Sequence, residues 1–177
     1  MAKALEVAKF FIEVVANNPL EDAMTNLRLN KLLYFAQAAS INTLGYFIID
    51  EDFEAWKFGP VVPSIYEHYK EYGRHGITNE AFDRHALSRK EQLYLLDVLR
   101  KYSDRSTASL VNESHKPHSP WEASYSKDNK VISKRQIQSF FSNEVVDTFS
   151  PQYKEEDFVG ARDESDVLVL PHEISHA

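Results

Sequence analysis

Apolar and polar residues alternate with the period of an α-helix through the first 45 residues of the chain. Apolar residues spaced three and four apart predict an amphipathic helix over residues 3–17, and Pro19 ends it, because the residue before a proline is pushed out of the helical region. A second helix is predicted from a cap at Thr25 or Asn26 to Gly45. Its residues are apolar nearly all round, which is typical of a helix that other elements surround.

The pattern then changes to short extended pieces. Residues 46–57 predict a strand, an acidic turn and a second short strand, and Gly59-Pro60 predicts a tight turn. Pro63 suits the first position of a new helix, where its missing N–H costs nothing, and Gly73 ends that helix.

Capping boxes, in which two residues three apart bond each other's backbone N–H groups, mark the starts of three later helices. They are Ser88 with Glu91, Ser119 with Glu122, and Ser133 with Gln136. A brief helix is also predicted from Ser106 or Thr107 through Glu113. The helix after Ser88 is expected to turn four apolar residues toward the core, namely Leu95, Leu96, Leu99 and Tyr102.

These elements predict a mainly α protein, a single compact helical bundle around the central buried helix at 26–44, with a small two-stranded β element near 46–57. Beyond Ser150, aromatic residues become rare and helical periodicity is lost. We therefore predict a helical domain over residues 1–147 and an acidic C-terminal tail over 148–177, flexible or loosely docked. Its one short apolar run, Val167–Leu170, is expected either to add a strand or to dock as a peptide.

Most of the net charge of −7 lies in that tail. Residues 151–177 hold seven acidic and two basic residues, which leaves only −2 for the first 150 residues. Nucleic-acid binding normally needs a basic stripe, whereas the basic clusters at 84–90 and 100–105 are offset by neighbouring acids. The charge pattern therefore favours a protein partner over a nucleic acid. The chain has no cysteine and no apolar run long enough to span a bilayer, so we expect a soluble, cytoplasmic protein without a membrane partner.

No set of residues predicts catalysis or a bound metal or cofactor. The closest pair of histidines, His115 and His118, is interrupted by Pro117 and cannot share a helix face, and zinc needs three or four converging ligands. A carboxylate such as Glu54 with a distant histidine does not define a hydrolase site, and the sequence contains no nucleophile elbow and no glycine-rich phosphate loop. We therefore predict no enzyme, no catalytic residue, no metal and no cofactor.

Two features each allow two interpretations. Trp56 and Trp121 are either core anchors whose indole N–H bonds a nearby carbonyl, or hot spots of a protein interface. The segment Arg105–Glu113 is either an ordinary packing helix or the second helix of a helix-turn-helix.

The chain resembles the Panacea domain family, also described as SocA-like or prophage GepA-like, in three segments that occur in the same order. They are Leu29-x-Lys31-Leu32-Leu33-Tyr34, then Phe53-x-Ala55-Trp56-x-x-Gly59-Pro60-Val61, then Ser114-His115 followed by Trp121. The similarity covers about residues 5–141. It implies a mostly helical antitoxin domain, found in toxin–antitoxin operons and prophages, that neutralises varied toxins by direct binding. Asn30 departs from the glutamine that the family usually shows, which shortens the side chain but keeps its amide.

We therefore predict an antitoxin that binds a cognate toxin protein non-covalently. Two other classes stay open: a prophage-encoded adaptor or regulatory protein-binding module, and a helix-turn-helix-like autoregulator of its operon. Self-association into a homo-oligomer is also compatible with the sequence. Exposure and motif membership suggest seven partner-binding residues, namely Tyr34, Trp56, Lys57, Tyr66, Tyr69, His115 and Trp121.

Overall fold

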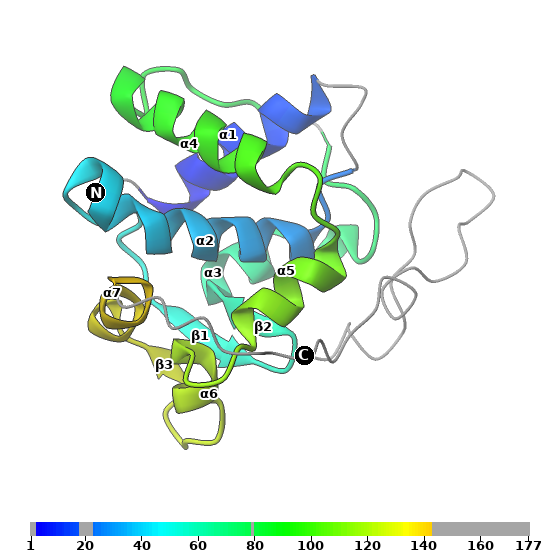
Figure 1. Ribbon diagram of the computed structural model, residues 1–177. Coiled ribbons are helices and arrows are strands. Elements are labelled where there is room, and N and C mark those ends of the chain that lie inside the picture. The colour runs from blue at the N-terminus through cyan, green and yellow to red at the C-terminus, as the bar shows by residue number, and fades with distance from the viewer. Residues whose placement is uncertain (1–2, 18–22, 79, 143–177) are drawn as a thin grey trace.

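The computed structural model describes residues 3–17, 23–78 and 80–142. Within these ranges the chain forms seven α-helices, one 3₁₀ turn and a three-stranded sheet (Figure 1). The mainly helical fold predicted from the sequence is confirmed. In chain order the elements are α1 (Ala4–Ala16), α2 (Asn26–Leu44), β1 (Phe53–Trp56), β2 (Gly59–Val61), α3 (Pro63–Tyr69), the 3₁₀ turn (Lys70–Tyr72), α4 (Arg89–Tyr102), α5 (Thr107–Ser114), α6 (Pro120–Tyr125), β3 (Val131–Ile132) and α7 (Lys134–Ser142).

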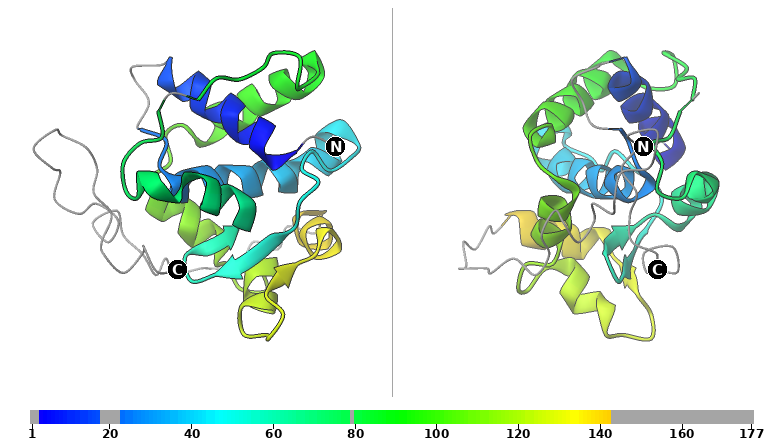
Figure 2. Two further views of the ribbon diagram at one scale, coloured as in Figure 1. Left: turned by 180° about the vertical axis from the view of Figure 1, so that it is seen from behind. Right: turned by 90° about the vertical axis from the view of Figure 1, so that its right-hand side faces the viewer.

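Helix α2 is the central element, as its nearly all-round apolar sequence predicted. Figures 1 and 2 show α1 and α4 on one side of it and the sheet with α5, α6 and α7 on the other. The Thr25 hydroxyl caps its first turn by accepting from Arg28 N at 3.2 Å. At its end Gly45 takes a left-handed conformation, φ 86°, which favours glycine.

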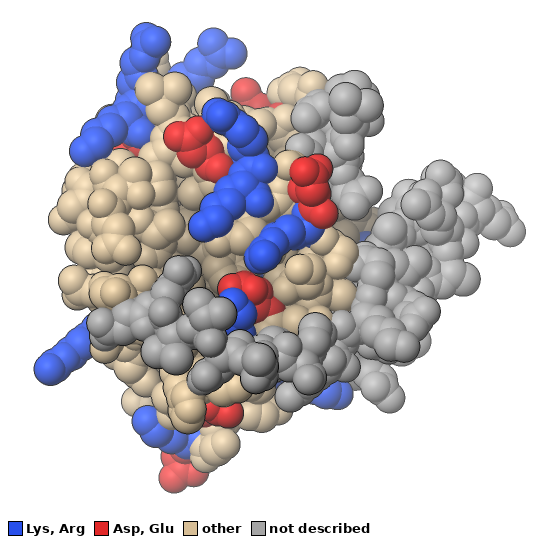
Figure 3. Space-filling model, in the orientation of Figure 1, with Lys and Arg blue, Asp and Glu red and all other residues tan. Residues whose placement is uncertain are grey.

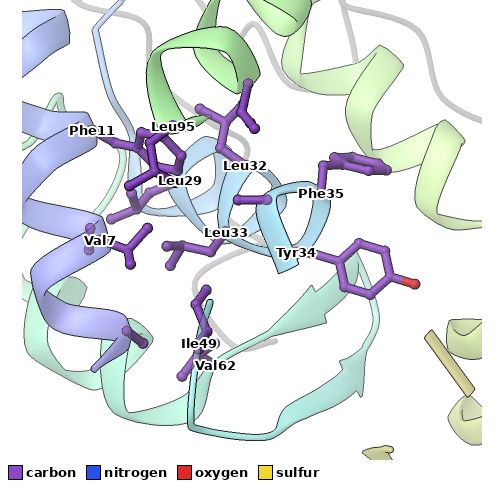
Figure 4. Close-up of a cluster of buried hydrophobic side chains, with 14 of the residues drawn as sticks. Val7, Phe11, Leu29, Leu32, Leu33, Tyr34, Phe35, Ile49, Val62 and Leu95 are labelled. Carbon is purple, nitrogen blue, oxygen red and sulfur yellow. The ribbon is translucent and has the colours of Figure 1, made fainter. Parts of the chain in front are cut away.

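The core lies between α2 and the two helices α1 and α4, and it continues on the other side of α2, where residues 48–49 pack against that helix. Its side chains are almost entirely excluded from solvent, which is the main source of stability in such a fold. Figure 4 shows the centre of this cluster, with Val7 and Phe11 from α1, Leu29, Leu32, Leu33 and Phe35 from α2, Leu95 from α4, and Ile49 and Val62 from the sheet side.

The sheet differs from the predicted β element in both its turn and its number of strands. The hairpin turn lies at residues 57–58, so Gly59 and Pro60 belong to β2 instead of forming the turn. Strand β3 pairs with the other edge of β1, with Phe53 opposite Ile132, and gives the strand order β2-β1-β3.

Residues 46–52, where the first strand was predicted, pair mainly with side chains of α2. Ser40 Oγ accepts from Ile48 N at 3.2 Å. The Gln37 amide accepts from Ile49 N and donates to Ile49 O, both at 2.9 Å. Side chains of α2 thus bond the backbone N–H and C=O groups that a neighbouring strand would otherwise bond. This explains why the extended segment forms only an isolated bridge at Ile49.

Two of the three predicted capping boxes are complete. Ser88 and Glu91 bond each other's backbone N–H, and so do Ser133 and Gln136. The third is half formed: Ser119 Oγ accepts from Glu122 N, but the Glu122 carboxylate accepts from His118 N at 2.6 Å instead of from Ser119.

The inward face of α4 is narrower than predicted. Leu95 and Tyr102 are buried and Leu99 is half-buried, whereas Leu96 is 38% exposed. Leu96 lies about 100° around the helix from Leu95, which points it away from the core. The prediction for Leu96 was therefore wrong.

The predicted tail at 148–177, including Val167–Leu170, lies outside the described residues. Among the helices of the described ranges, none has the length and apolar character that crossing a membrane requires.

Candidate functional site

The three segments that carry the family resemblance meet at one junction between α2, β2 and α5. Lys31 of α2 is fully buried, and its Nζ donates to Pro60 O at 2.6 Å. Burial lowers the pKa of this lysine well below its ordinary value of 10.5. Ser114, at the end of α5, is also buried and donates to Val111 O at 2.7 Å.

Gly59 is required at this junction because two side chains approach it closely. A Cβ placed on Gly59 would lie 2.5 Å from Ser114 Oγ and 2.8 Å from Lys31 Nζ. Its φ of 100° is also one that L residues rarely adopt. The glycine therefore lets β2 pass directly over the buried lysine.

Two asparagines of α2 fix the strand end and the start of α3. Asn30 Oδ1 accepts from Val62 N at 3.0 Å, and Asn30 Nδ2 donates to Asn26 Oδ1 at 2.9 Å. Asn26 Nδ2 in turn donates to Tyr66 O at 3.0 Å. The Asn30 amide thus reaches the backbone between β2 and α3.

His115 and Trp121 hold the hairpin turn from the inside. The His115 ring is buried, with Nδ1 2.7 Å from Val111 O and Nε2 3.3 Å from Lys57 O. It packs edge-to-face against Trp121, whose Nε1 donates to Trp56 O at 2.7 Å. Trp121 thus has its N–H bonded to a carbonyl, as a core anchor would, but its ring is only half-buried and leaves part of its surface exposed.

Burial keeps His115 uncharged near neutral pH. The pKa of His115 is lowered from 6.5 to about 4, mainly by burial and with a smaller contribution from Lys31, against the opposing effect of the Val111 carbonyl. A neutral imidazole has one N–H, and the shorter contact assigns that proton to Nδ1, facing Val111. The uncharged His115 ring therefore packs beneath the hairpin turn at residues 57–58 as part of the interior.

The outer side of the hairpin carries a partly exposed aromatic surface. Trp56 and Tyr66 pack edge-to-face with ring centroids 4.8 Å apart, and Trp56 Nε1 donates to Glu54 Oε2 at 2.9 Å. Lys57, at the tip of the turn, is exposed. We call Trp56, Lys57, Tyr66 and Trp121 the hairpin surface.

The seven residues predicted to bind a partner divide into two groups. Lys57 is exposed, and Trp56, Tyr66 and Trp121 are half-buried, so these four present atoms to solvent. Three are buried and contribute to the core instead, namely Tyr34, Tyr69 and His115. In this conformation those three cannot touch a partner directly.

Three residues that shape this region are not among the sequence-based candidates. Lys31 belongs to the first family segment and Asn26 was a candidate helix cap, but neither was predicted as a site residue, and the third residue is Tyr125. Tyr125 stacks on Trp121 with ring centroids 4.6 Å apart. Its spacing of four residues from Trp121 on a helix is a signal that could have indicated the pair.

Helix α5 is used for packing. Its residues Leu110 and Val111 are fully buried, and the helix lies against α2 and β2. Within the described ranges, no three histidine, aspartate or glutamate side chains converge as metal ligands would.

The chain is similar in sequence to known proteins. Residues 29–122, more than half of the chain, match the family described as antitoxin SocA-like, Panacea domain. The chain is 32% identical over 130 residues to the antitoxin SocA of Caulobacter vibrioides (strain NA1000 / CB15N), an alignment that covers 67% of this chain and 68% of that protein. No solved structure gives a significant match. The chain belongs to the SocA-like antitoxin family, which confirms the predicted resemblance.

Proposed function

We propose that this protein is the antitoxin of a toxin–antitoxin pair and that it neutralises its cognate toxin by stoichiometric, non-covalent binding. The observation that carries this proposal is family membership, together with a relative that is itself named an antitoxin. Neutralisation by binding requires a surface, not a reaction centre. At the junction of α2, β2 and α5, the buried Lys31 and Ser114 side chains donate to backbone carbonyls and so support the fold.

We place the toxin contact on the hairpin surface. Partly exposed tryptophan and tyrosine side chains beside a cation are typical of the centre of a protein interface. The ring packing of Trp56 on Tyr66 and the bond from Trp121 to Trp56 O hold these side chains in place before a partner arrives. Less conformational entropy is then lost when the complex forms.

Co-expression with the gene adjacent to the antitoxin gene tests both parts of the proposal. Growth should be rescued by the wild-type chain, and purified components should form a complex of fixed ratio. Lys57→Glu reverses an exposed charge and loses only the contact of Nζ with the Phe58 ring, 5.1 Å from its centroid, so it should lower the melting temperature little while weakening the complex at least tenfold.

Arg89→Glu is the matched control, because Arg89 is an exposed cation on α4, on the opposite side of α2 from the sheet. It should leave binding unchanged. If Lys57→Glu and Tyr66→Ala both bind the toxin normally, the hairpin surface is not the toxin contact, but the antitoxin role is not refuted. Failure of the wild-type chain to rescue growth or bind the neighbouring gene product would refute that role for this pair.

A further inference from the structure

A groove of about 350 Å³ opens between α2, the end of α4, α5 and α7, away from the hairpin surface. Its apolar lining comes mainly from α2, where Ala38 and Ala39 present only methyl groups. Phe35 and Tyr102 stack with ring centroids 5.0 Å apart and bring aromatic faces to the lining. Phe141, the penultimate residue of α7, lines the remaining side.

The charged part of the groove is biased toward positive charge. Lys101 and Arg105 line it and are exposed, and Glu113 is its one acidic lining residue within the described ranges. Glu113 lies 3.6 Å from Arg105 and is bonded to Lys116, so this one carboxylate is shared between two cations. Basic side chains also gather on this face near the end of α4, with acidic ones beside them (Figure 3). The groove therefore suits a segment that combines apolar side chains with carboxylates.

We propose that residues 163–171 of this same chain are that segment. Asp163, Glu164 and Asp166 precede the apolar run Val167–Leu170, so the segment carries three carboxylates next to four apolar side chains. Its acids complement Lys101 and Arg105, and its apolar residues match the lining of alanines and aromatic rings. The inference is independent of the proposed function, because it concerns a different surface.

The position of α7 makes the contact geometrically accessible. Phe141 lines the groove, so the chain that follows Ser142 starts beside it. Twenty residues separate Ser142 from Asp163. Twenty residues can span at most about 70 Å when fully extended, so the length of chain between Ser142 and Asp163 does not prevent the segment from reaching the groove.

The absence of cysteine from the chain permits a direct test by paramagnetic relaxation in the full-length protein. A nitroxide at Asn42→Cys, an exposed position lining the groove, should broaden the amide signals of residues 167–170 strongly. A nitroxide at Asp128→Cys, exposed in the loop after α6, should broaden them at least threefold less. Equal broadening from both positions, or none from either, would overturn the proposal.

Two sets of variants and one mixing experiment make the test specific. The double variant Lys101→Glu, Arg105→Glu should reduce the broadening caused by the nitroxide at position 42 at least threefold. The double variant Leu168→Asp, Leu170→Asp, which changes only the segment, should do the same. Arg89→Glu should not. Persistence of the effect in both double variants would count against the proposed contacts. Broadening in an isotope-labelled chain caused by a separate spin-labelled chain would instead identify a second copy as the occupant and refute the intramolecular contact.

Discussion

The side-chain nitrogen of Lys31 lies 2.6 Å from the carbonyl oxygen of Pro60, in a position where the lysine has no exposure to solvent. Burying a lysine amine is costly, and its lowered pKa reflects that cost. The bond holds β2 against the N-terminal half of α2. The junction of the three family segments is therefore built around one buried, titratable donor.

Replacing Lys31 with methionine should abolish a pH dependence of stability. The folded-state pKa of Lys31 is lowered, so the free energy of unfolding of the wild type should rise as pH increases from that lowered pKa toward 10.5. Lys31→Met keeps the volume and removes the titration. Urea unfolding of both proteins between neutral pH and pH 10 should show their difference changing with pH, and a constant difference would contradict the prediction.

His115 should make the protein less stable in acid. Its pKa is about 4 when folded against 6.5 when unfolded, so its contribution is complete above pH 6.5 and is lost as pH falls toward 4. The loss should approach about 3 kcal/mol. His115→Gln should lack this component, which is measured as the difference between the two proteins in urea unfolding across that range. Parallel pH profiles would show that the ring is not buried in its neutral form.

Gly59→Ala should destabilise the fold by at least about 3 kcal/mol, because it combines backbone strain with overpacking against Lys31 and Ser114. Gly45→Ala is the matched control. Gly45 has a similar φ of 86°, but a Cβ added there would meet no atom within 4 Å, so only the strain of about 1 kcal/mol is expected. Thermal unfolding of both variants separates the two costs, and equal losses would exclude the close approach at Gly59.

Tyr34→Phe should leave stability unchanged or raise it by about 1 kcal/mol. The Tyr34 hydroxyl is buried without a hydrogen-bond partner within the described part of the chain, so removing it relieves a desolvation cost. Tyr94→Phe provides the contrast, since the Tyr94 hydroxyl donates to Ala36 O and its loss should cost about 1 to 2 kcal/mol. Chemical denaturation measures both. A large loss in Tyr34→Phe would reveal a partner for that hydroxyl.

The main helices could be predicted because their signals are local. Ser88 caps a helix whose periodicity is strong, and Thr25 caps α2, whose central residues 32–39 are mostly apolar. The sheet was less predictable because its pairing depends on distant groups: Gln37 replaces a neighbouring strand for Ile49, and β3 contains only two residues. A strand of that length leaves no periodic pattern in a sequence.

The candidate site was only partly predictable for a related reason. Motif membership brought Tyr34, Trp56 and His115 together as candidates, but a motif contains residues that hold the fold as well as residues that face a partner. Burial separates these roles, and it depends on the packing of α2 against elements far away in the sequence. Trp56 remained accessible, whereas Tyr34 and His115 became interior.

The bonds that hold the hairpin end on its main chain. Trp121 and Lys31 donate to the carbonyl oxygens of residues 56 and 60, and every amino acid supplies such an oxygen. These bonds to the main chain therefore do not depend on which side chains the turn exposes to solvent. Residues at the tip can be exchanged while the tip keeps its place, so one scaffold can acquire a new binding specificity without rebuilding its interior.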